Sequence, residues 1–335
     1  MPAPLVTVVI PYFQREAGVL RKALSSVALQ ENCPGTVLAL IVDDASPAPA
    51  APEVAAVDWP DGIQAQVIQQ ANGGPGAARN TGLNSAPDGS DFIAFLDSDD
   101  EWSADHLARA STTLRQGFDF YFADHLQLGA DVSAFRRAKR IQPTDHLALP
   151  SLDQAFAYQG DFFDQTLRHN VVGTSTVVIS RPRLGKLRFR PEFTSAGEDY
   201  LFWMEASLHQ ARVAFSTKIE AVYGRGINVF AGSGWGTEGH LKRIHDETAF
   251  KKHVLRNFEL DSLQASSVRT DLQRLRVSFW RDVIRRLRRD RRVPFDLIRR
   301  QLAVDPLTFI AAPAHLLVIA RDLLSNAQAK ESEKP

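Results

Sequence analysis

The chain has 335 residues, of which 44% are hydrophobic, 39 are basic and 39 are acidic. Its formal net charge of zero argues against a nucleic-acid-binding protein, and its length and apolar content are sufficient for a sizeable core. The single cysteine, Cys33, excludes an intramolecular disulfide framework and fits a reducing compartment.

The N-terminal part of the sequence alternates between short apolar runs and segments with helical spacing of apolar residues. The apolar runs predict strands, and the segments between them predict helices. The predicted strands are 6–10, 37–42, 66–68 and 92–96, and the predicted helices lie within 15–30 and 77–85. Apolar strands that alternate with helices are typical of a mostly parallel α/β sheet, whose ligands bind at the carboxyl ends of the strands.

The pattern is less regular in the second half of the chain. Segments 118–122 and 171–179 are predicted to be strands, and Gly197 precedes an amphipathic helix. From Thr237 onwards the sequence is mainly helical. No run reaches the roughly 20 apolar residues that cross a bilayer, and the N-terminus shows no secretory signal. We therefore expect a cytoplasmic protein, with peripheral contact at the inner face of the cell membrane left open.

The acidic segment after the fourth predicted strand is the strongest candidate for a functional site. Asp97, Asp99 and Asp100 supply carboxylate oxygens, which are the ligands that Mg²⁺ and Mn²⁺ prefer. A cation bound there could share its coordination with the phosphates of a diphosphate ligand and neutralise their charge. The alternative is a solvated acidic turn that caps the next helix, with Asp100 or Ser103 near its N-terminus. Of the three aspartates, we expect Asp97 and Asp99 to form the site and Asp100 to belong to the start of that helix.

Two other polar groups lie where predicted elements end or begin. Asp43 and Asp44 close the second strand, where a carboxylate could bind a base or ribose, or form an Asx-turn before Pro47. Arg79 follows the Gly-rich turn 73–76 and could bind a diphosphate or form a structural salt bridge. The turn is not a Walker loop, because no Gly-Lys-Ser/Thr follows it.

Glu198 and Asp199 form a second acidic pair, at the start of a predicted helix. Transfer of a group to a hydroxyl needs a base that takes the hydroxyl proton, and one carboxylate would serve. Acidic residues also stabilise a helix N-terminus without any catalytic role. Taken alone, this pair therefore favours an ordinary helix N-terminus, and a catalytic role is indicated only in combination with the other motifs.

Taken together, four segments resemble those of a family 2 glycosyltransferase of the GT-A fold. The resemblance covers about residues 6–232. It rests on Val-Val-Ile-Pro-Tyr-Phe-Gln-Arg at 8–15, Ile-Val-Asp-Asp-Ala-Ser at 41–46, Asn-Gly-Gly-Pro-Gly-Ala-Ala-Arg-Asn-Thr-Gly at 72–82 and Phe-Leu-Asp-Ser-Asp-Asp at 95–100. It implies a GT-A catalytic domain at 1–235, with a donor half of about 1–110 and an acceptor half of about 111–235, followed by a helical, Arg-rich region at 236–335.

The resemblance also implies a reaction and a set of site residues. A family member of this kind moves one sugar, with inversion, from a nucleotide diphosphate sugar to a saccharide or lipid-linked saccharide in cell-surface polysaccharide synthesis, and UDP is the expected nucleotide. Asp97 and above all Asp99 would bind Mn²⁺ or Mg²⁺, and Asp199 would be the base, with Glu198 as the alternative. The implied nucleotide-sugar site comprises Pro11, Tyr12, Phe13, Asp43, Asp44, Arg79, Asp97 and Ser98.

The sequence departs from the family pattern in places. Phe13 stands where asparagine is usual, and the Gln/Arg-x-x-Arg-Trp motif of processive synthases is absent. Segments 223–226 and 234–236 occupy the acceptor-side region instead, where Trp235 could stack on a sugar ring or act as a packing anchor. Two rival interpretations are a non-catalytic nucleotide-sugar-binding module and a sugar nucleotidyltransferase.

The C-terminal region carries a strongly basic segment. Nine arginines lie between Arg274 and Arg292, and a helix there would have an apolar side made of Val277, Trp280, Val283, Ile284 and Leu287. A basic amphipathic helix is typical of a membrane surface, which segment 307–324 could extend. The alternative is a helix packed on the catalytic domain with a solvated basic face.

Overall fold

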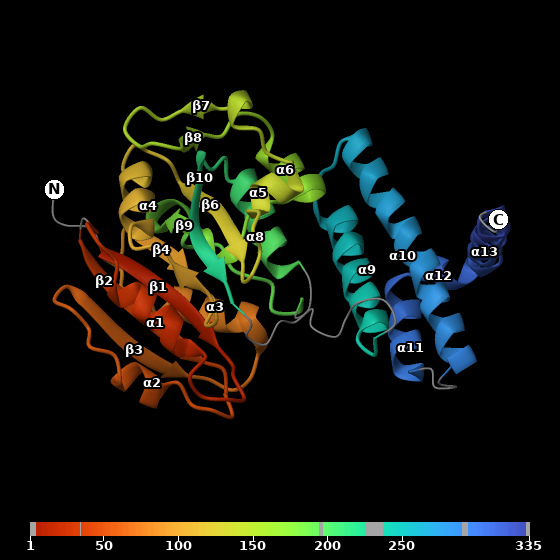
Figure 1. Ribbon diagram of the computed structural model, residues 1–335, viewed down its shortest axis with the longest axis horizontal. Coiled ribbons are helices and arrows are strands. Elements are labelled where there is room, and N and C mark those ends of the chain that lie inside the picture. The colour runs from red at the N-terminus through yellow and green to blue at the C-terminus, as the bar shows by residue number, and fades with distance from the viewer. Residues whose placement is uncertain (1–4, 34, 194–196, 225–236, 290–293, 333–335) are drawn as a thin grey trace. The chain divides into compact units, whose positions relative to one another are not determined.

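The computed structural model describes residues 5–33, 35–193, 197–224, 237–289 and 294–332, with side chains up to residue 322. The chain divides into two compact units (Figure 1). The first unit comprises Met1–Thr194 and Glu198–Ile227, and the second comprises Ser195–Gly197 and Asn228–Pro335.

A mixed sheet forms the centre of the first unit, and within the described residues it has ten strands in the order β3-β2-β1-β4-β9-β6-β10-β8-β7, with β5 paired to β10. In chain order they are β1 (Leu5–Tyr12), β2 (Thr36–Asp43), β3 (Ile63–Gln69), β4 (Phe92–Phe95), β5 (Glu101–Trp102), β6 (Phe120–Gln127), β7 (Leu147–Ala148), β8 (Ala155–Ala157), β9 (Val178–Ser180) and β10 (Val213–Tyr223). The half β3-β2-β1-β4 is parallel throughout, whereas β9 runs antiparallel to both β4 and β6.

Helices cover both faces of this sheet. They are α1 (Leu20–Ala28), α2 (Ala51–Ala55), α3 (Gly74–Ser85), α4 (His106–Leu114), α5 (Ala134–Ala138), α6 (Phe162–His169), α7 (Arg181–Leu184) and α8 (Glu198–Leu208), with 3₁₀ turns η1 (Pro143–Asp145) and η2 (Thr174–Thr176). A first apolar cluster joins the sheet to α1, α2 and α4, and a second joins it to α3, α6 and α8.

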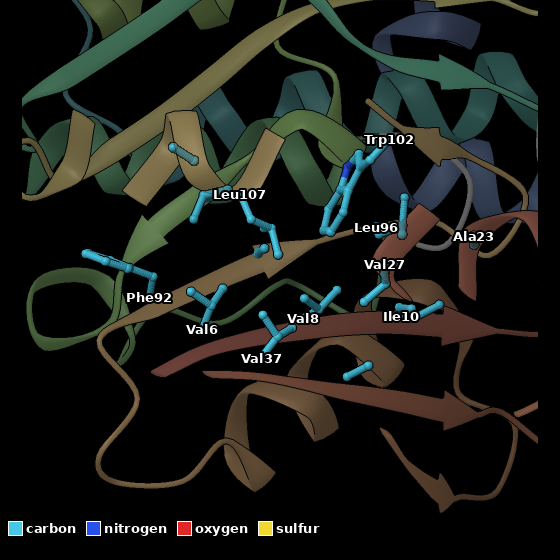
Figure 2. Packing of buried hydrophobic residues seen from close by; sticks show 14 of the residues in the cluster. Val6, Val8, Ile10, Ala23, Val27, Val37, Phe92, Leu96, Trp102 and Leu107 are labelled. Carbon is cyan, nitrogen blue, oxygen red and sulfur yellow. The ribbon is translucent and has the colours of Figure 1, made fainter. Parts of the chain in front are cut away.

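Strand β1 shows why these apolar runs become strands. Val8 and Ile10 belong to the first cluster, together with Val27 of α1, whereas the intervening Val9 belongs to the second cluster (Figure 2). Alternate side chains of a strand point to opposite faces. A run such as 6–10, which is apolar except at Thr7, therefore fits a strand that is buried on both faces.

Helix α3 packs closely on β1 because it carries a glycine at the contact. A Cβ atom at Gly82 would lie 2.3 Å from Cγ1 of Val9, which no side chain tolerates. Glycine therefore allows the helix backbone to approach the strand. The same helix carries Arg79 at one end of the sheet.

Most of the predicted elements are confirmed. The predicted strands 6–10, 37–42, 66–68 and 92–96 correspond to β1 to β4, and 118–122 overlaps β6. The prediction of a strand at 171–179 is wrong for most of its length, because only β9 is extended there. In η2, the Thr176 hydroxyl donates to the Gly173 carbonyl at 2.8 Å, a local bond that competes with strand formation.

Strand β10 was not predicted, because Lys218 and Glu220 interrupt its apolar run. Glu220 is nevertheless fully buried. Its carboxylate accepts hydrogen bonds of 2.7 Å from Arg109 Nε and from the Tyr121 hydroxyl, and it lies 2.8 Å from His106 Nδ1. These partners come from α4 and β6, so a charge on a central strand is satisfied by residues remote in sequence.

The second unit is helical over the residues that the structure describes. Its helices are α9 (His240–Asn257), α10 (Ser262–Arg289), α11 (Phe295–Val304), α12 (Leu307–Ile310) and α13 (Ala312–Ser332). Phe279 and Val283 of α10 are buried against Leu241 and Ile244 of α9. None of the described helices has both the length and the apolar character that crossing a membrane requires.

Candidate active site

Two acidic segments follow parallel strands that flank β1 on its two sides, at the same edge of the sheet. Asp44 directly follows β2, and Asp97 lies two residues after the end of β4. The backbone keeps both segments in register with β1, because the amide of Asp44 donates to the Tyr12 carbonyl at 2.9 Å and that of Leu96 to the Val9 carbonyl at 3.1 Å. The predicted strand-end arrangement is therefore present.

The acidic segment alternates between exposed and buried side chains. Asp97 and Asp99 are partly exposed, whereas Ser98 and Asp100 are buried. A turn closes the segment, since the amide of Asp100 donates to the Asp97 carbonyl at 3.1 Å. The Ser98 hydroxyl accepts a hydrogen bond of 3.2 Å from Gln14 Nε2. The two aspartates of the Asp-x-Asp pattern are therefore the ones that solvent, and hence a ligand, can reach.

Arg79 lies buried between the two acidic motifs. Its Nη2 is 2.7 Å from Asp97 Oδ1 and its Nη1 is 3.2 Å from Glu198 Oε1, while its guanidinium lies 5.3 Å from the centre of the Phe189 ring. Burial alone would lower the pKa of Arg79, but the two carboxylates raise it, so the group stays charged. Of the two predicted roles, the structure shows a salt bridge, and one that joins both acidic motifs.

Glu198 and Asp199 occupy the first turn of α8 in different surroundings. Burial raises the pKa of Glu198 to about 7, with Asp199 adding to this effect and Arg79 opposing it. Burial also raises the pKa of Asp199 above its ordinary value, again against the effect of Arg79. Asp199 Oδ2 accepts a hydrogen bond of 3.3 Å from the Thr174 hydroxyl, and its Oδ1 accepts from the amide of Tyr200 at 2.8 Å.

Asp100 does not begin a helix, which corrects one prediction. The short strand β5 follows it, and α4 begins only at His106. Oδ2 of Asp100 accepts from the Ser175 hydroxyl at 2.5 Å, and Oδ1 accepts from the amide of Gly224 at 2.9 Å. Burial, followed by repulsion from Asp97 and Asp99, raises the pKa of Asp100 to about 8. The segment therefore concentrates more negative charge than its surroundings balance.

The side chains of Asp43 and Asp44 both accept hydrogen bonds from backbone amides. Asp43 accepts from the amides of Ser46 at 2.8 Å and Ala50 at 2.9 Å, so it holds the loop around Pro47 by bonds that reach further along the chain than the two residues of an Asx-turn. Asp44 accepts from the amides of Gly73 at 2.8 Å and Gly74 at 2.7 Å, and from Gln70 Nε2 at 2.7 Å. Asp44 thus ties the end of β2 to the start of α3.

The residues at the end of β1 differ in their exposure. The ring of Tyr12 is only 1% exposed and belongs to the core, with its hydroxyl 3.3 Å from Glu53 Oε1. Pro11 is buried and Phe13 is partly exposed. Of these three predicted pocket residues, Phe13 is therefore the one whose side chain solvent reaches.

The donor atoms fit a divalent cation that completes its coordination with a ligand. Among the described residues, no group of three or more His, Cys, Asp or Glu is arranged to hold a metal ion by itself. Cations such as Mg²⁺ commonly take one or two protein carboxylates and fill their remaining positions with substrate phosphates and water. Asp97 and Asp99 supply two such carboxylates. Their negative charge is also reflected in the raised pKa of the neighbouring Asp100.

Sequence reasoning missed two groups at this site. His125 stacks on Tyr223 with ring centroids 4.2 Å apart, and the Tyr223 hydroxyl accepts from the amide of Ser175 at 3.3 Å. The only sequence signal was the Tyr-Gly pair at 223–224 within the acceptor-side segment. Trp235, the predicted sugar-stacking residue, lies outside the described residues.

The sheet order, the Asp-x-Asp turn at its edge and the acidic pair on α8 define a glycosyltransferase of the GT-A fold. The model of the family described as glycosyl transferase family 2 matches residues 7–180, and the chain belongs to this family. The chain is therefore a glycosyltransferase enzyme, which sets aside the binding-module and nucleotidyltransferase interpretations.

Relatives of known sequence agree with this assignment. The chain is 33% identical over 323 residues to the succinoglycan biosynthesis protein ExoW of Rhizobium meliloti (strain 1021), an alignment that covers 93% of this chain and 98% of the relative. It is also 33% identical over 107 residues to the minor teichoic acid biosynthesis protein GgaA of Bacillus subtilis (strain 168), covering 31% of this chain and 23% of the relative.

Solved structures show the same fold at low sequence identity. Residues 1–349 of S. aureus TarS in complex with UDP-GlcNAc superimpose with a TM-score of 0.56 at 18% identity, covering 90% of this chain and 79% of that chain. The mannosyltransferase PcManGT from Pyrobaculum calidifontis, in complex with GDP-Man and Mn²⁺, gives a TM-score of 0.54 at 15% identity, covering 99% of this chain and 81% of that chain. This chain spans 43% of the longer S. aureus TarS chain.

Proposed function

We propose that this glycosyltransferase moves one sugar from a UDP-sugar, with inversion, to a hydroxyl of a saccharide or lipid-linked saccharide in cell-surface polysaccharide synthesis. The observation that carries the proposal is the pair of partly exposed aspartates, Asp97 and Asp99, of which Asp97 is joined through Arg79 to Glu198 of the acidic pair on α8. The relative named for succinoglycan biosynthesis and the TarS complex with UDP-GlcNAc support the pathway class and the nucleotide.

Within this proposal Asp199 is the base and Glu198 is a structural partner of Arg79. Glu198 forms an ion pair with the guanidinium, so removing a proton from an acceptor would have to compete with that pair. Side-chain oxygen Oδ2 of Asp199 accepts only a hydroxyl hydrogen bond, from Thr174, among the bonds that the structure describes. Its raised pKa also makes it a stronger base than an ordinary aspartate.

Asp97 and Asp99 would hold the divalent cation, Mn²⁺ or Mg²⁺. When bound, the cation supplies positive charge to the diphosphate leaving group. Arg79 keeps Asp97 oriented and, because it stays charged, offsets part of the negative charge of the site. The PcManGT complex, which contains Mn²⁺, supports a metal requirement for the fold.

Release of UDP from UDP-sugars, with a saccharide acceptor mixture and Mn²⁺, tests the function. We expect wild-type protein to release UDP, and we expect both EDTA and the substitution Asp99→Ala to reduce the rate by roughly 10²–10³-fold, the range seen when one electrostatic stabiliser of a transition state is lost. Glu101→Ala, an exposed carboxylate of β5, is the matched control. Full activity in both EDTA and Asp99→Ala would refute the metal assignment.

We also propose that the enzyme lies at the inner face of the cell membrane and that α11 and α12 make the contact. Part of the predicted apolar side of α10 lies inside the second unit, since Val283 is buried and Trp280 packs against the same cluster, whereas Leu287 is 55% exposed. By contrast, Phe295 is 82% and Ile310 is 72% exposed. Exposed arginines such as Arg299 accompany these side chains, a combination that suits anionic lipid.

Flotation with vesicles of anionic phosphatidylglycerol and neutral phosphatidylcholine tests this contact. We expect the double substitution Phe295→Ser and Ile310→Ser to lower the bound fraction several-fold, as expected from lost apolar burial. Leu263→Ser in the first turn of α10, where the leucine is 70% exposed, is the control. Equal binding of wild type, double variant and control, or no binding of wild type, would contradict the proposal.

A further inference from the structure

The 3₁₀ turn η2 lies beside both acidic motifs of the active site, although nothing in the reaction assigns it a role. It comes directly before β9, which pairs with β4, the strand that leads into the acidic segment. Thr174 donates to Asp199, the proposed base. Its neighbour Ser175 contacts the acidic segment instead.

Ser175 is fully buried, and both its hydroxyl and its amide bond to groups of the site. Its hydroxyl oxygen accepts a hydrogen bond of 3.0 Å from the amide of Asp97 and donates one of 2.5 Å to Asp100 Oδ2. Its amide donates to the Tyr223 hydroxyl at 3.3 Å, and its carbonyl accepts a hydrogen bond from Trp102 Nε1. One side chain therefore holds both ends of the Asp97–Asp100 turn.

The other side of the turn is held by the end of β10. The amide of Gly224 donates to Asp100 Oδ1 at 2.9 Å. A Cβ atom at Gly224 would lie 1.8 Å from the carbonyl oxygen of Asp99, so the two backbones are in direct contact. Asp100 is thus fixed from two directions, by Ser175 and by Gly224. With Asp100 fixed inward, the alternation along the segment leaves Asp97 and Asp99 facing solvent.

Other buried hydroxyls of the first unit provide the contrast. Thr166 of α6 is 1% exposed, and its hydroxyl donates to the carbonyl of Phe162 in its own helix at 3.0 Å. That bond is a local one without contact to an acidic motif. Ser175 differs because its hydroxyl connects groups 78 and 75 residues away in the sequence.

We propose that Ser175 is a positioning residue, whose hydroxyl holds the amide of Asp97 and the carboxyl group of Asp100 so that Asp97 and Asp99 present their oxygens to the divalent cation. This inference rests on the proposed metal site and adds a residue that does not touch the metal. Removing a group that orients a metal ligand typically weakens metal binding by about 10–100-fold.

The test is a titration of the full-length protein with Mn²⁺ in the presence of saturating UDP. A second series replaces UDP with GDP. In both series, free Mn²⁺ is followed by electron paramagnetic resonance. We expect Ser175→Ala to weaken Mn²⁺ binding by about 10–100-fold. Thr166→Ala also removes a buried hydroxyl and should keep the wild-type Mn²⁺ affinity. The midpoint of thermal unfolding, measured for both variants, separates a loss of stability from a loss of metal affinity.

Asp100→Asn serves as a second variant, since it keeps the shape of the side chain and an oxygen that can accept from Gly224. It should weaken Mn²⁺ binding in the same direction, and it keeps the proposal testable if Ser175→Ala fails to fold. The inference is overturned if Ser175→Ala and Asp100→Asn both bind Mn²⁺ within twofold of wild type while Asp99→Ala does not. If Asp99→Ala also binds normally, the proposed metal site itself fails.

Discussion

Carboxylates paired with arginine or lysine occur in both units of the chain, but these positive partners are distributed differently. In the first unit, the single guanidinium of Arg79 serves both Asp97 and Glu198. In the second unit, Asp305 alone has two cations, with Arg276 Nε 2.7 Å from its Oδ2 and Lys252 Nζ 3.2 Å from its Oδ1. In the first unit, therefore, one arginine is shared by two carboxylates. In the second unit, one carboxylate is paired with an arginine and a lysine.

The pKa directions follow this distribution. Burial raises the pKa of Glu198 and Asp199, and the one nearby guanidinium does not compensate. Burial acts in the same direction on Asp305, yet the hydrogen bond and charge of Arg276 lower its pKa overall. An anion that the protein has fully paired contributes to structure, whereas anions left in excess mark a place where a cation from solution is expected to bind.

Glu220 shows that the direction of a carboxyl pKa shift depends on the local partners of the group and not on the unit in which it lies. It lies in the first unit, but the pKa of its carboxyl group is lowered: burial would raise it, and the partners His106, Tyr121 and Arg109 outweigh that effect. Glu220 and the carboxylates of the proposed site thus lie in the same unit, and they differ in how completely the protein pairs them.

The largest effect is expected at the proposed base. Asp199→Asn should reduce kcat by roughly 10²–10⁴-fold, the contribution typical of general base catalysis, with little loss of stability. Because burial raises the pKa of Asp199, the wild-type rate should rise with pH through a limb that lies above the ordinary value of 3.8. Steady-state rates of UDP release from pH 4 to 9 would measure both.

Glu198→Gln is the matched comparison for that variant. It keeps an oxygen that Arg79 can reach and should lower kcat far less than Asp199→Asn. The opposite order of the two variants would assign the base to Glu198 and would break the distinction drawn between them.

A smaller but still large effect is expected for the paired aspartate of the second unit. Asp305→Ala leaves Arg276 and Lys252 without their buried partner and should lower the free energy of unfolding by roughly 3–5 kcal/mol. Because the folded pKa of Asp305 is lowered, its ionised form stabilises the fold above a pH of about 3.9, and this stabilisation is lost as pH falls through the folded pKa. Guanidinium chloride unfolding at pH 7 and at pH 3 would show a smaller difference between wild type and variant at pH 3.

The smallest effect is expected for an exposed ion pair in the same unit. Asp296 and Arg300 lie 2.6 Å apart on α11, with side chains that are 61% and 65% exposed. Asp296→Asn should change the free energy of unfolding by less than about 0.5 kcal/mol. A loss of unfolding free energy comparable to that of Asp305→Ala would show that burial and the number of partners do not determine how much an ion pair stabilises the fold.

The strand-end half of the site could be predicted from sequence because its signals are local. Mostly apolar runs predicted β1, β2 and β4, and polar residues directly after them indicated the edge where a ligand binds. The order of the four motifs then allowed the family to be recognised. These features depend on residues that are neighbours in the chain, so one sequence carries them.

The contacts that organise the site could not be predicted, because they join distant segments. The link from Arg79 to Glu198 spans 119 residues, and the link from Ser175 to Asp100 spans 75. Asp100 was interpreted as the start of a helix because its inward partners were not visible in the sequence. The run at 171–179 was interpreted as a strand because β-branched residues favour strands. In η2, however, the Thr176 hydroxyl bonds locally to the Gly173 carbonyl, and the Thr174 and Ser175 hydroxyls bond to distant acidic residues.

The backbone contact between Gly224 and Asp99 has a consequence for exchanging parts between related enzymes. A hybrid that took its donor-side segment from this chain and its acceptor-side segment from another would have to carry glycine at the junction, because even a methyl group there would meet the Asp99 carbonyl oxygen at 1.8 Å. A crossover placed after Gly224 keeps the glycine that allows the fit, together with the Tyr223 hydroxyl that accepts from Ser175. A functional hybrid with a junction near Tyr223 and Gly224 thus requires a residue without a side chain at position 224.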